Sequence, residues 1–177
     1  MVSNENYESY VNEGRITLLP KAEMHKYEGY HRENYQEDQR ISKFLTQQSP
    51  KWAIIAGYYA MHNLTKLFLA KCNLKIGDRA AHTATIIALR KHIQDEKMRE
   101  QVLTLLHKAQ EAYDVLNSPL KEKILAVMLS SSLEERNKAQ YYSEDFKKVM
   151  LQHAMYFQEN IILPYIEIMQ ELTLHVT

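Results

Sequence analysis

Residues 49–74 read SPKWAIIAGYYAMHNLTKLFLAKCNL, and this stretch decides the fold because apolar residues occupy every side of its helical projection. Ser49-Pro50 is typical of a helix start, with serine at the N-cap and proline in the first helical position. A helix that is apolar all round is normally buried. The stretch therefore predicts a central buried helix over about residues 50–72, in which Gly57 allows another helix to approach closely.

Further helical segments lie on both sides of this central helix. Over about residues 95–116, apolar residues recur at alternating steps of four and three, which is the spacing of one helix face. Ser118-Pro119 repeats the helix-start signal, and Pro164 is expected to kink the last helix or to end a segment of it. The predicted helices lie at about residues 34–48, 50–72, 79–93, 95–116, 119–141 and from 143 onward. No strand pattern competes, so the sequence predicts an all-α, up-and-down bundle of five to six helices.

The N-terminal part differs in composition from the rest of the chain. Residues 1–33 are polar and rich in tyrosine, and Gly14, Pro20 and Gly29 act there as helix breakers. We expect residues 1–33 to form an arm or short helix, and residues 34–177 to form one helical bundle. A chain of 177 residues is long enough to bury a single core of this kind.

Composition and charge exclude several classes of protein. The formal net charge is zero, so no overall field attracts nucleic acid or an anionic membrane, although a local basic pocket stays open. The single cysteine, Cys72, excludes an internal disulfide and fits a reducing compartment. The polar start MVSNENYESY is not a signal peptide, and the longest uncharged run, residues 52–65, is too short to span a bilayer. We therefore expect a soluble, cytoplasmic protein without membrane contact.

Signals for a metal, a cofactor or a reactive nucleophile are weak. Di-iron bundles carry paired Glu-x-x-His repeats on facing helices, and this spacing occurs once here, from Glu28 to His31 in the predicted arm. Cys72 has no second cysteine and no obvious activating partner, and no phosphate-binding glycine loop is present. The sequence predicts no metal site and no cofactor.

Three polar residues on apolar helices are candidate binding residues. His62 and Asn63 interrupt the central helix, so they must find partners inside the bundle or face a groove or a second subunit. His82 begins the apolar stripe of the next helix. A histidine at the edge of a core is usually packed and hydrogen-bonded, and this interpretation stays open for His82 beside a role in binding.

The stretch LEERNKAQYYSED, residues 133–145, contains the remaining candidates. Arg136 continues an apolar row of leucines, so it either reaches solvent or is held at a pocket or an interface. At a pocket, Arg136 can bind a phosphate bidentately and Asn137 can hydrogen-bond. Tyr141 or Tyr142 can stack on a base there.

Together these segments resemble the HEPN superfamily (higher eukaryotes and prokaryotes nucleotide-binding domains). The central helix is similar to its tyrosine-rich second helix, and AHTATIIAL, residues 81–89, resembles the His-Thr-rich start of the next one. ERNKAQYYSED, residues 135–145, is similar to the Arg-x-x-Ala-x-Tyr variant that precedes the last helix. The resemblance spans about residues 34–162. It implies a helical bundle, a homodimer, and a role in RNA cleavage, toxin–antitoxin or defence systems, or nucleotide binding beside a nucleotidyltransferase-type partner.

The chain departs from the ribonucleases of that superfamily at one position. Those enzymes carry an arginine, a gap of four to six residues and then a histidine, whereas none of the seven arginines here has a histidine at that spacing. Tyr141 and Tyr142 stand at the expected place after Arg136. Tyrosine, with a pKa near about 10, is a poor base at neutral pH. The sequence therefore favours a protein that has kept the site but not the nuclease chemistry.

Three functions remain open at this stage. The first is a non-catalytic HEPN-like protein that binds RNA or a nucleotide at a dimer groove around Arg136. The second is a helical interaction protein that docks a partner protein. The third is a ribonuclease that uses a different general base, such as His82 or His62. We expect a homodimer in which the central helix approaches its symmetry mate.

Overall fold

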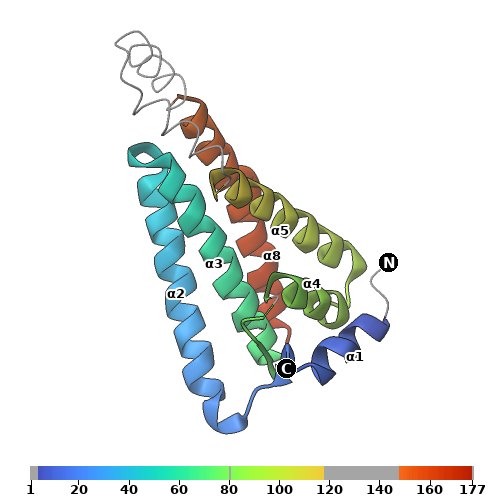
Figure 1. Cartoon of the computed structure of the whole chain (residues 1–177). Helices are drawn as coiled ribbons and strands as arrows, with labels where there is room; N and C mark the ends of the chain where they lie inside the picture. Colours follow the sequence, from blue (N-terminus) through green and yellow to red (C-terminus); the bar gives the residue numbers. More distant parts are fainter. Residues whose placement is uncertain (1–3, 80, 118–147, 177) are drawn as a thin grey trace, which may run out of the picture.

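The structure is a computed structural model and describes residues 4–79, 81–117 and 148–176. Its long helices run side by side, alternately up and down, and two short helices lie at one end of the molecule (Figure 1). The elements are α1 (Asn4–Asn12), β1 (Ile16–Leu18), α2 (Lys21–Gln48), α3 (Pro50–Lys71), β2 (Leu74–Ile76), α4 (Ala81–His92), α5 (Glu96–Asn117), a helical stretch over 148–157, η1 (Gln158–Ile162) and α8 (Leu163–Leu174). The predicted all-α bundle is confirmed.

Helix α3 is the centre of the bundle, as the sequence predicts. It packs along α2 and also contacts α4, α5, η1 and α8. Its most buried side chains include Met61, Leu64, Phe68 and Leu69, none of which is more than 2% exposed. Because α3 buries most of its apolar surface within its own chain, its composition does not require a second subunit. The homodimer through this helix therefore rests on the sequence resemblance alone.

Gly57 is the point of closest approach between helices. A Cβ placed on Gly57 would lie 2.0 Å from Ile162 Cδ1 and 2.9 Å from Ser42 Oγ. Ser42 is itself buried, and its hydroxyl lies 2.7 Å from the carbonyl oxygen of Ala53 and 3.0 Å from Gln158 Oε1. The predicted close approach at Gly57 is confirmed, and it joins α2, α3 and η1.

Pro164 marks a change of helix type in the C-terminal segment. The backbone N–H of Leu163 donates to the carbonyl oxygen of Gln158, which gives the wider turn of a π-helix. Helix α8 then begins at Leu163 with Pro164 in its first turn, where the missing N–H of proline is tolerated. The predicted segment boundary at Pro164 is confirmed.

Two local predictions are wrong, and the helix start at Ser49-Pro50 is confirmed without the hydrogen bond of a side-chain cap. Helix α2 begins at Lys21, and not near residue 34, because Gly29 lowers helix propensity without breaking a long helix. Ser49 holds the N-cap position of α3, but its side chain makes no capping hydrogen bond. Two short strands were not predicted, since three residues are too few to show an alternating pattern. They pair antiparallel, with Ile16 opposite Ile76.

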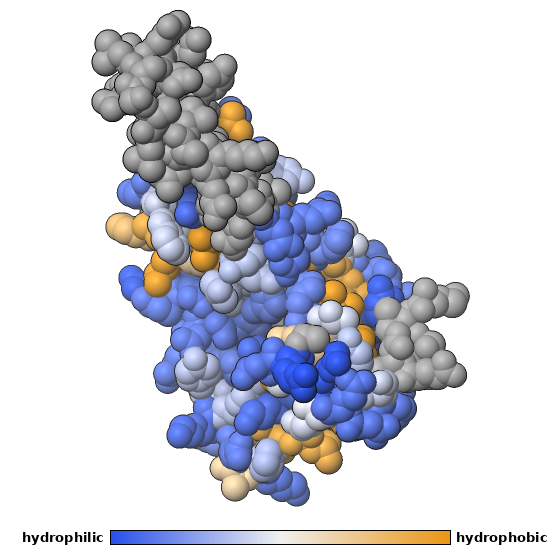
Figure 2. All heavy atoms as spheres, viewed as in Figure 1, coloured by the Kyte–Doolittle hydropathy of each residue, from blue (hydrophilic) through white to orange (hydrophobic). Residues whose placement is uncertain are grey.

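The face of the molecule seen in Figure 2 is mostly hydrophilic. In the view of Figure 2 the apolar residues form separate patches among hydrophilic ones. Within residues 4–79, 81–117 and 148–176, no helix has both the length and the apolar character needed to cross a membrane.

Candidate functional site

The sequence-predicted site residues divide into two groups. His62 and Asn63 lie near the middle of α3, and His82 is the second residue of α4. Arg136, Asn137, Tyr141 and Tyr142 lie outside the described residues. The geometry therefore concerns the first group and the side chains that surround it.

Asn63 belongs to a hydrogen-bond network between α3 and α2. Its Oδ1 lies 2.9 Å from Nδ1 of His31, and its Nδ2 donates to Asp38 Oδ2 at 2.9 Å. Because Asn63 Oδ1 can only accept, His31 carries its proton on Nδ1. The His31 ring also meets the ring of Tyr27 edge-on at a centroid distance of 4.4 Å. Both ends of the Asn63 amide are thus engaged, which makes this residue a link between helices.

Burial acts on the two ionisable members of this network. It lowers the pKa of His31, and the hydrogen bond that His31 donates to Asn63 offsets part of that effect. Burial likewise raises the pKa of Asp38. Each shift favours the neutral form, as expected for groups withdrawn from water. Both hydrogen bonds of the network run through the neutral Asn63 amide, so His31 and Asp38 are linked without a direct ion pair among the described residues.

His62, the neighbour of Asn63, lies in a different environment. Its ring meets Tyr58 edge-on at 4.4 Å and faces the tilted ring of His82 at a centroid distance of 5.8 Å. Its Nε2 is buried and has no hydrogen-bond partner among the described residues. Burial, with smaller contributions from His82 and Lys66, lowers the pKa of His62 to about 4. The imidazole is consequently neutral at physiological pH.

His82 shows the same feature from the side of α4. Its Nδ1 is buried and has no hydrogen-bond partner in the described part of the chain. Burial lowers the pKa of His82, and the carboxylate of Asp114 opposes that shift. Two neutral imidazoles from different helices thus lie side by side, each with an unsatisfied nitrogen. Buried polar atoms of this kind are rare in native structures and usually have a water, an ion or a ligand as partner.

A group of aromatic and polar residues that the sequence analysis did not single out completes the site. Tyr58 stacks on Tyr113 of α5 at 4.3 Å with an interplanar angle of 19°, and its hydroxyl donates to Oε1 of Gln110. Nε2 of Gln110 donates to Asp114 Oδ1 at 2.8 Å. Tyr59 is 46% exposed, and its hydroxyl lies 3.3 Å from that of Tyr113. Stacked and exposed tyrosines therefore border the histidine pair.

The missed residues carry a signal that helical spacing could have shown. His62 lies three and four residues after Tyr59 and Tyr58, and Tyr113 and Asp114 lie three and four residues after Gln110, so each trio lies on one side of its helix. What the sequence could not show is that α3 and α5 turn these faces toward one another.

The chemistry available at this site is hydrogen bonding and aromatic stacking. Across the described residues, no group of three or more His, Cys, Asp or Glu side chains is arranged to hold a metal ion. A general base works best when its pKa is near the working pH. The pKa of His62, at about 4, is well below neutral pH. Burial also raises the pKa of Tyr58. The arrangement suits binding better than proton transfer.

Comparison with known proteins gives no relative. No protein-family model matches the chain, and no curated protein or solved structure is similar enough to count as a match. The resemblance to the HEPN superfamily thus stays a prediction from the sequence.

Proposed function

We propose that the protein is a non-catalytic, HEPN-like protein that binds RNA or a nucleotide beside the histidine pair of α3 and α4. The observation that carries this proposal is the pair of buried imidazole nitrogens, His62 Nε2 and His82 Nδ1, without partners among the described residues. A ligand that reaches these two nitrogens would supply the missing hydrogen bonds.

The chemistry around the pair favours a nucleobase. A neutral imidazole presents one donor and one acceptor, which complements the mixed donor and acceptor edge of a base. Tyr59 is half exposed and lies against Tyr58, the tyrosine that contacts His62, and it offers a ring on which a base can stack. Arg136, from the stretch that resembles the superfamily motif, is proposed as the phosphate contact, with Asn137, Tyr141 and Tyr142 as its neighbours.

Two arguments support a binding role over a catalytic one. The histidine that the superfamily's ribonucleases carry after the motif arginine is replaced by tyrosine. The described histidines that could take its place have lowered pKa values, with His62 at about 4, so they are weak bases near neutral pH. The resemblance further suggests a toxin–antitoxin or defence role, a homodimer and a nucleotidyltransferase-type partner, which belong to the proposal.

Titration calorimetry with AMP and with short single-stranded RNA tests the binding. We expect the wild type to bind at least one of these probes, and His62→Phe and Arg136→Ala to weaken binding at least about tenfold. His25→Phe, an exposed histidine of α2, is the matched control and should change nothing. If the wild type binds no probe, or if His62→Phe binds as tightly as the wild type, the proposed site is wrong.

An RNA cleavage assay without metal tests the absence of catalysis. We expect no turnover of single-stranded RNA above that of a mock purification. Turnover that disappears in Arg136→Ala would show instead that the protein is a ribonuclease with a different general base.

A further inference from the structure

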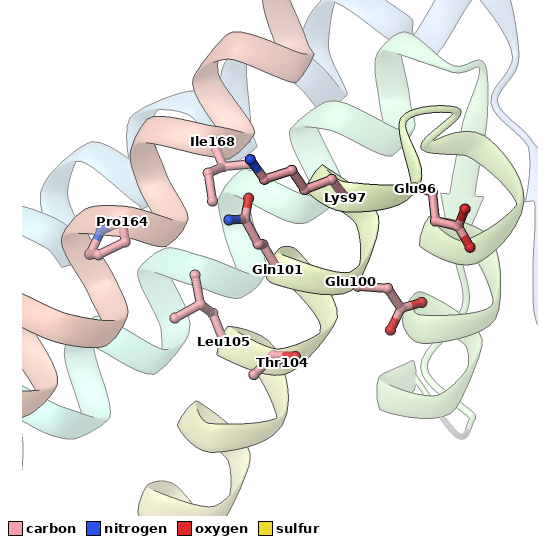
Figure 3. Close-up of a pocket in the computed structure, with 8 residues that line it drawn as sticks. All are labelled: Glu96, Lys97, Glu100, Gln101, Thr104, Leu105, Pro164 and Ile168. Atoms are coloured by element: carbon pink, nitrogen blue, oxygen red, sulfur yellow. The ribbon is translucent and has the colours of Figure 1, made fainter.

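The two halves of α5 border regions of different character. The N-terminal half borders an open groove of about 750 Å³, whose other side is formed by Pro164 and Ile168 of α8 (Figure 3). The polar side chains that line this groove are exposed, and none has a buried atom without a hydrogen-bond partner in the described part of the chain. The groove therefore does not indicate a particular ligand. The C-terminal half of α5, which carries Gln110, Tyr113 and Asp114, borders the histidine pair instead.

A series of contacts connects the Asp114 carboxylate with both histidines. The ring of His62 meets that of Tyr58 at 4.4 Å, and the Tyr58 hydroxyl donates to Oε1 of Gln110. Nε2 of the same Gln110 donates to Oδ1 of Asp114 at 2.8 Å. Burial lowers the pKa of His82, and the Asp114 carboxylate is near enough to oppose this shift. The carboxylate of Asp114 is thus held beside the two imidazoles.

The second oxygen of Asp114 is available to a ligand. The Asp114 side chain is exposed, and its Oδ2 makes no hydrogen bond or ion pair with any described residue. A carboxylate in its ionised form can only accept hydrogen bonds, whereas a neutral imidazole can donate one from its N–H. The site therefore combines an acceptor group from α5 with N–H donors from α3 and α4.

We propose that the base preferred at this site is guanine, and that Asp114 recognises it. This preference rests on the nucleotide site proposed above. Guanine places two adjacent donors, N1–H and the 2-amino group, beside the acceptor O6. Asp114 accepts from the two donors, and an imidazole N–H of the histidine pair donates to O6.

The other common bases fit this arrangement less well. Adenine, cytosine and uracil each offer the carboxylate at most one N–H, next to an acceptor atom that the carboxylate repels. A binding site built around hydrogen bonds discriminates strongly against a ligand that leaves one of its polar groups unpaired. The Asp114 carboxylate therefore favours guanine over each of them.

Titration calorimetry of the full chain with GMP, IMP and AMP tests the choice of base. We expect the wild type to bind GMP at least about tenfold more tightly than AMP. IMP, which lacks the 2-amino group of GMP, should bind with intermediate affinity. A wild type that binds AMP as tightly as GMP would overturn the guanine preference and leave the nucleotide site standing. A wild type that binds none of the three would overturn both.

Asp114→Asn gives the sharpest outcome, because it exchanges one acceptor for a donor. The oxygen of the new amide can still accept from Gln110, while its N–H meets the base. We expect GMP to bind at least about tenfold more weakly than to the wild type. XMP, which has a carbonyl in place of the 2-amino group, should bind at least about tenfold more tightly than to the wild type. A misfolded protein could not produce this gain.

The matched control is Glu100→Gln, which removes the same charge from the other half of α5, at the groove of Figure 3. This variant should keep the wild-type order of affinities. An Asp114→Asn protein that still prefers GMP, or that gains no affinity for XMP, would overturn the role of Asp114.

Discussion

His62 and Asn63 are neighbours in sequence, yet their side chains leave α3 in different directions and enter different hydrogen-bonding environments. Asn63 has a partner at each end of its amide, in His31 and Asp38 of α2. His62 faces α4 instead, where its Nε2 and the Nδ1 of His82 are both buried without a partner among the described residues. Within the described residues the first arrangement is complete, whereas the second is not. The difference separates a residue that links two helices from one whose nitrogen has no partner in the described structure, which is the feature on which the proposed ligand site rests.

The expected free-energy cost of a substitution also differs between the two residues. Removing one member of a satisfied buried network leaves its partners unpaired, and each unpaired group costs about 1 to 3 kcal/mol. Removing a group that is already unpaired costs little and can even stabilise the protein. The comparison therefore predicts opposite effects for substitutions at adjacent positions.

The largest expected effect is that of Asn63→Ala. This change leaves His31 Nδ1 and Asp38 Oδ2 without their partner, so the free energy of unfolding should fall by about 3 kcal/mol in a denaturant titration. Asn34→Ala is the matched control, because the Asn34 amide makes a hydrogen bond to the Tyr30 carbonyl oxygen on the exposed side of α2. Its effect should stay below about 1 kcal/mol. Equal losses in the two variants would show that the network does not stabilise the fold.

The sequence predicts helices well where the signal is local. Proline at residue 50 starts α3, and regular apolar spacing places α5 within a residue of its observed limits, Glu96 and Asn117. Contacts between distant residues leave no such signal. His31 and Asn63 are separated by 32 positions, and nothing in the spacing of either indicates that they meet. The fold class was thus predictable. The different environments of Asn63 and His62 were not, because they depend on how α2 and α4 pack on α3.

The next effect is a loss of stability in acid. Burial lowers the pKa of His62 to about 4, while the unfolded chain titrates near 6.5, so the unfolded state binds more protons between these values. The stability contributed by neutral His62 is present above the unfolded pKa and is lost as the pH falls toward about 4. At a pH of about 4.5 the loss should reach about 2 kcal/mol, and the lowered pKa values of His31 and His82 act in the same direction.

Denaturation at several pH values, with His62→Phe beside the wild type, isolates this contribution. The variant should lose less stability than the wild type over the same pH interval. Because the carboxylates and the other histidines are present in both proteins, the difference between the two curves reports the contribution of His62. Superimposable curves would mean that the His62 imidazole is not buried in its neutral form.

A smaller effect is expected for Asp38→Asn. The side-chain oxygen of the new asparagine can still accept the hydrogen bond from Asn63 Nδ2, and the substitution removes a carboxylate whose pKa burial has raised. Stability at neutral pH should change by less than about 1 kcal/mol. A loss as large as that of Asn63→Ala would show that the charge of Asp38, and not its hydrogen bond, stabilises the network.

The smallest expected effect on stability is that of His62→Phe at neutral pH. Phenylalanine keeps a ring against the edge of Tyr58, where the imidazole lies at 4.4 Å, and it removes the buried Nε2 that has no partner in the described chain. The free energy of unfolding should therefore stay within about 0.5 kcal/mol of the wild type or rise slightly. Nucleotide or RNA binding should nevertheless weaken at least about tenfold. A protein that keeps its stability and loses its ligand identifies a residue retained for binding, whereas a large loss of stability would place His62 with Asn63 as part of the fold.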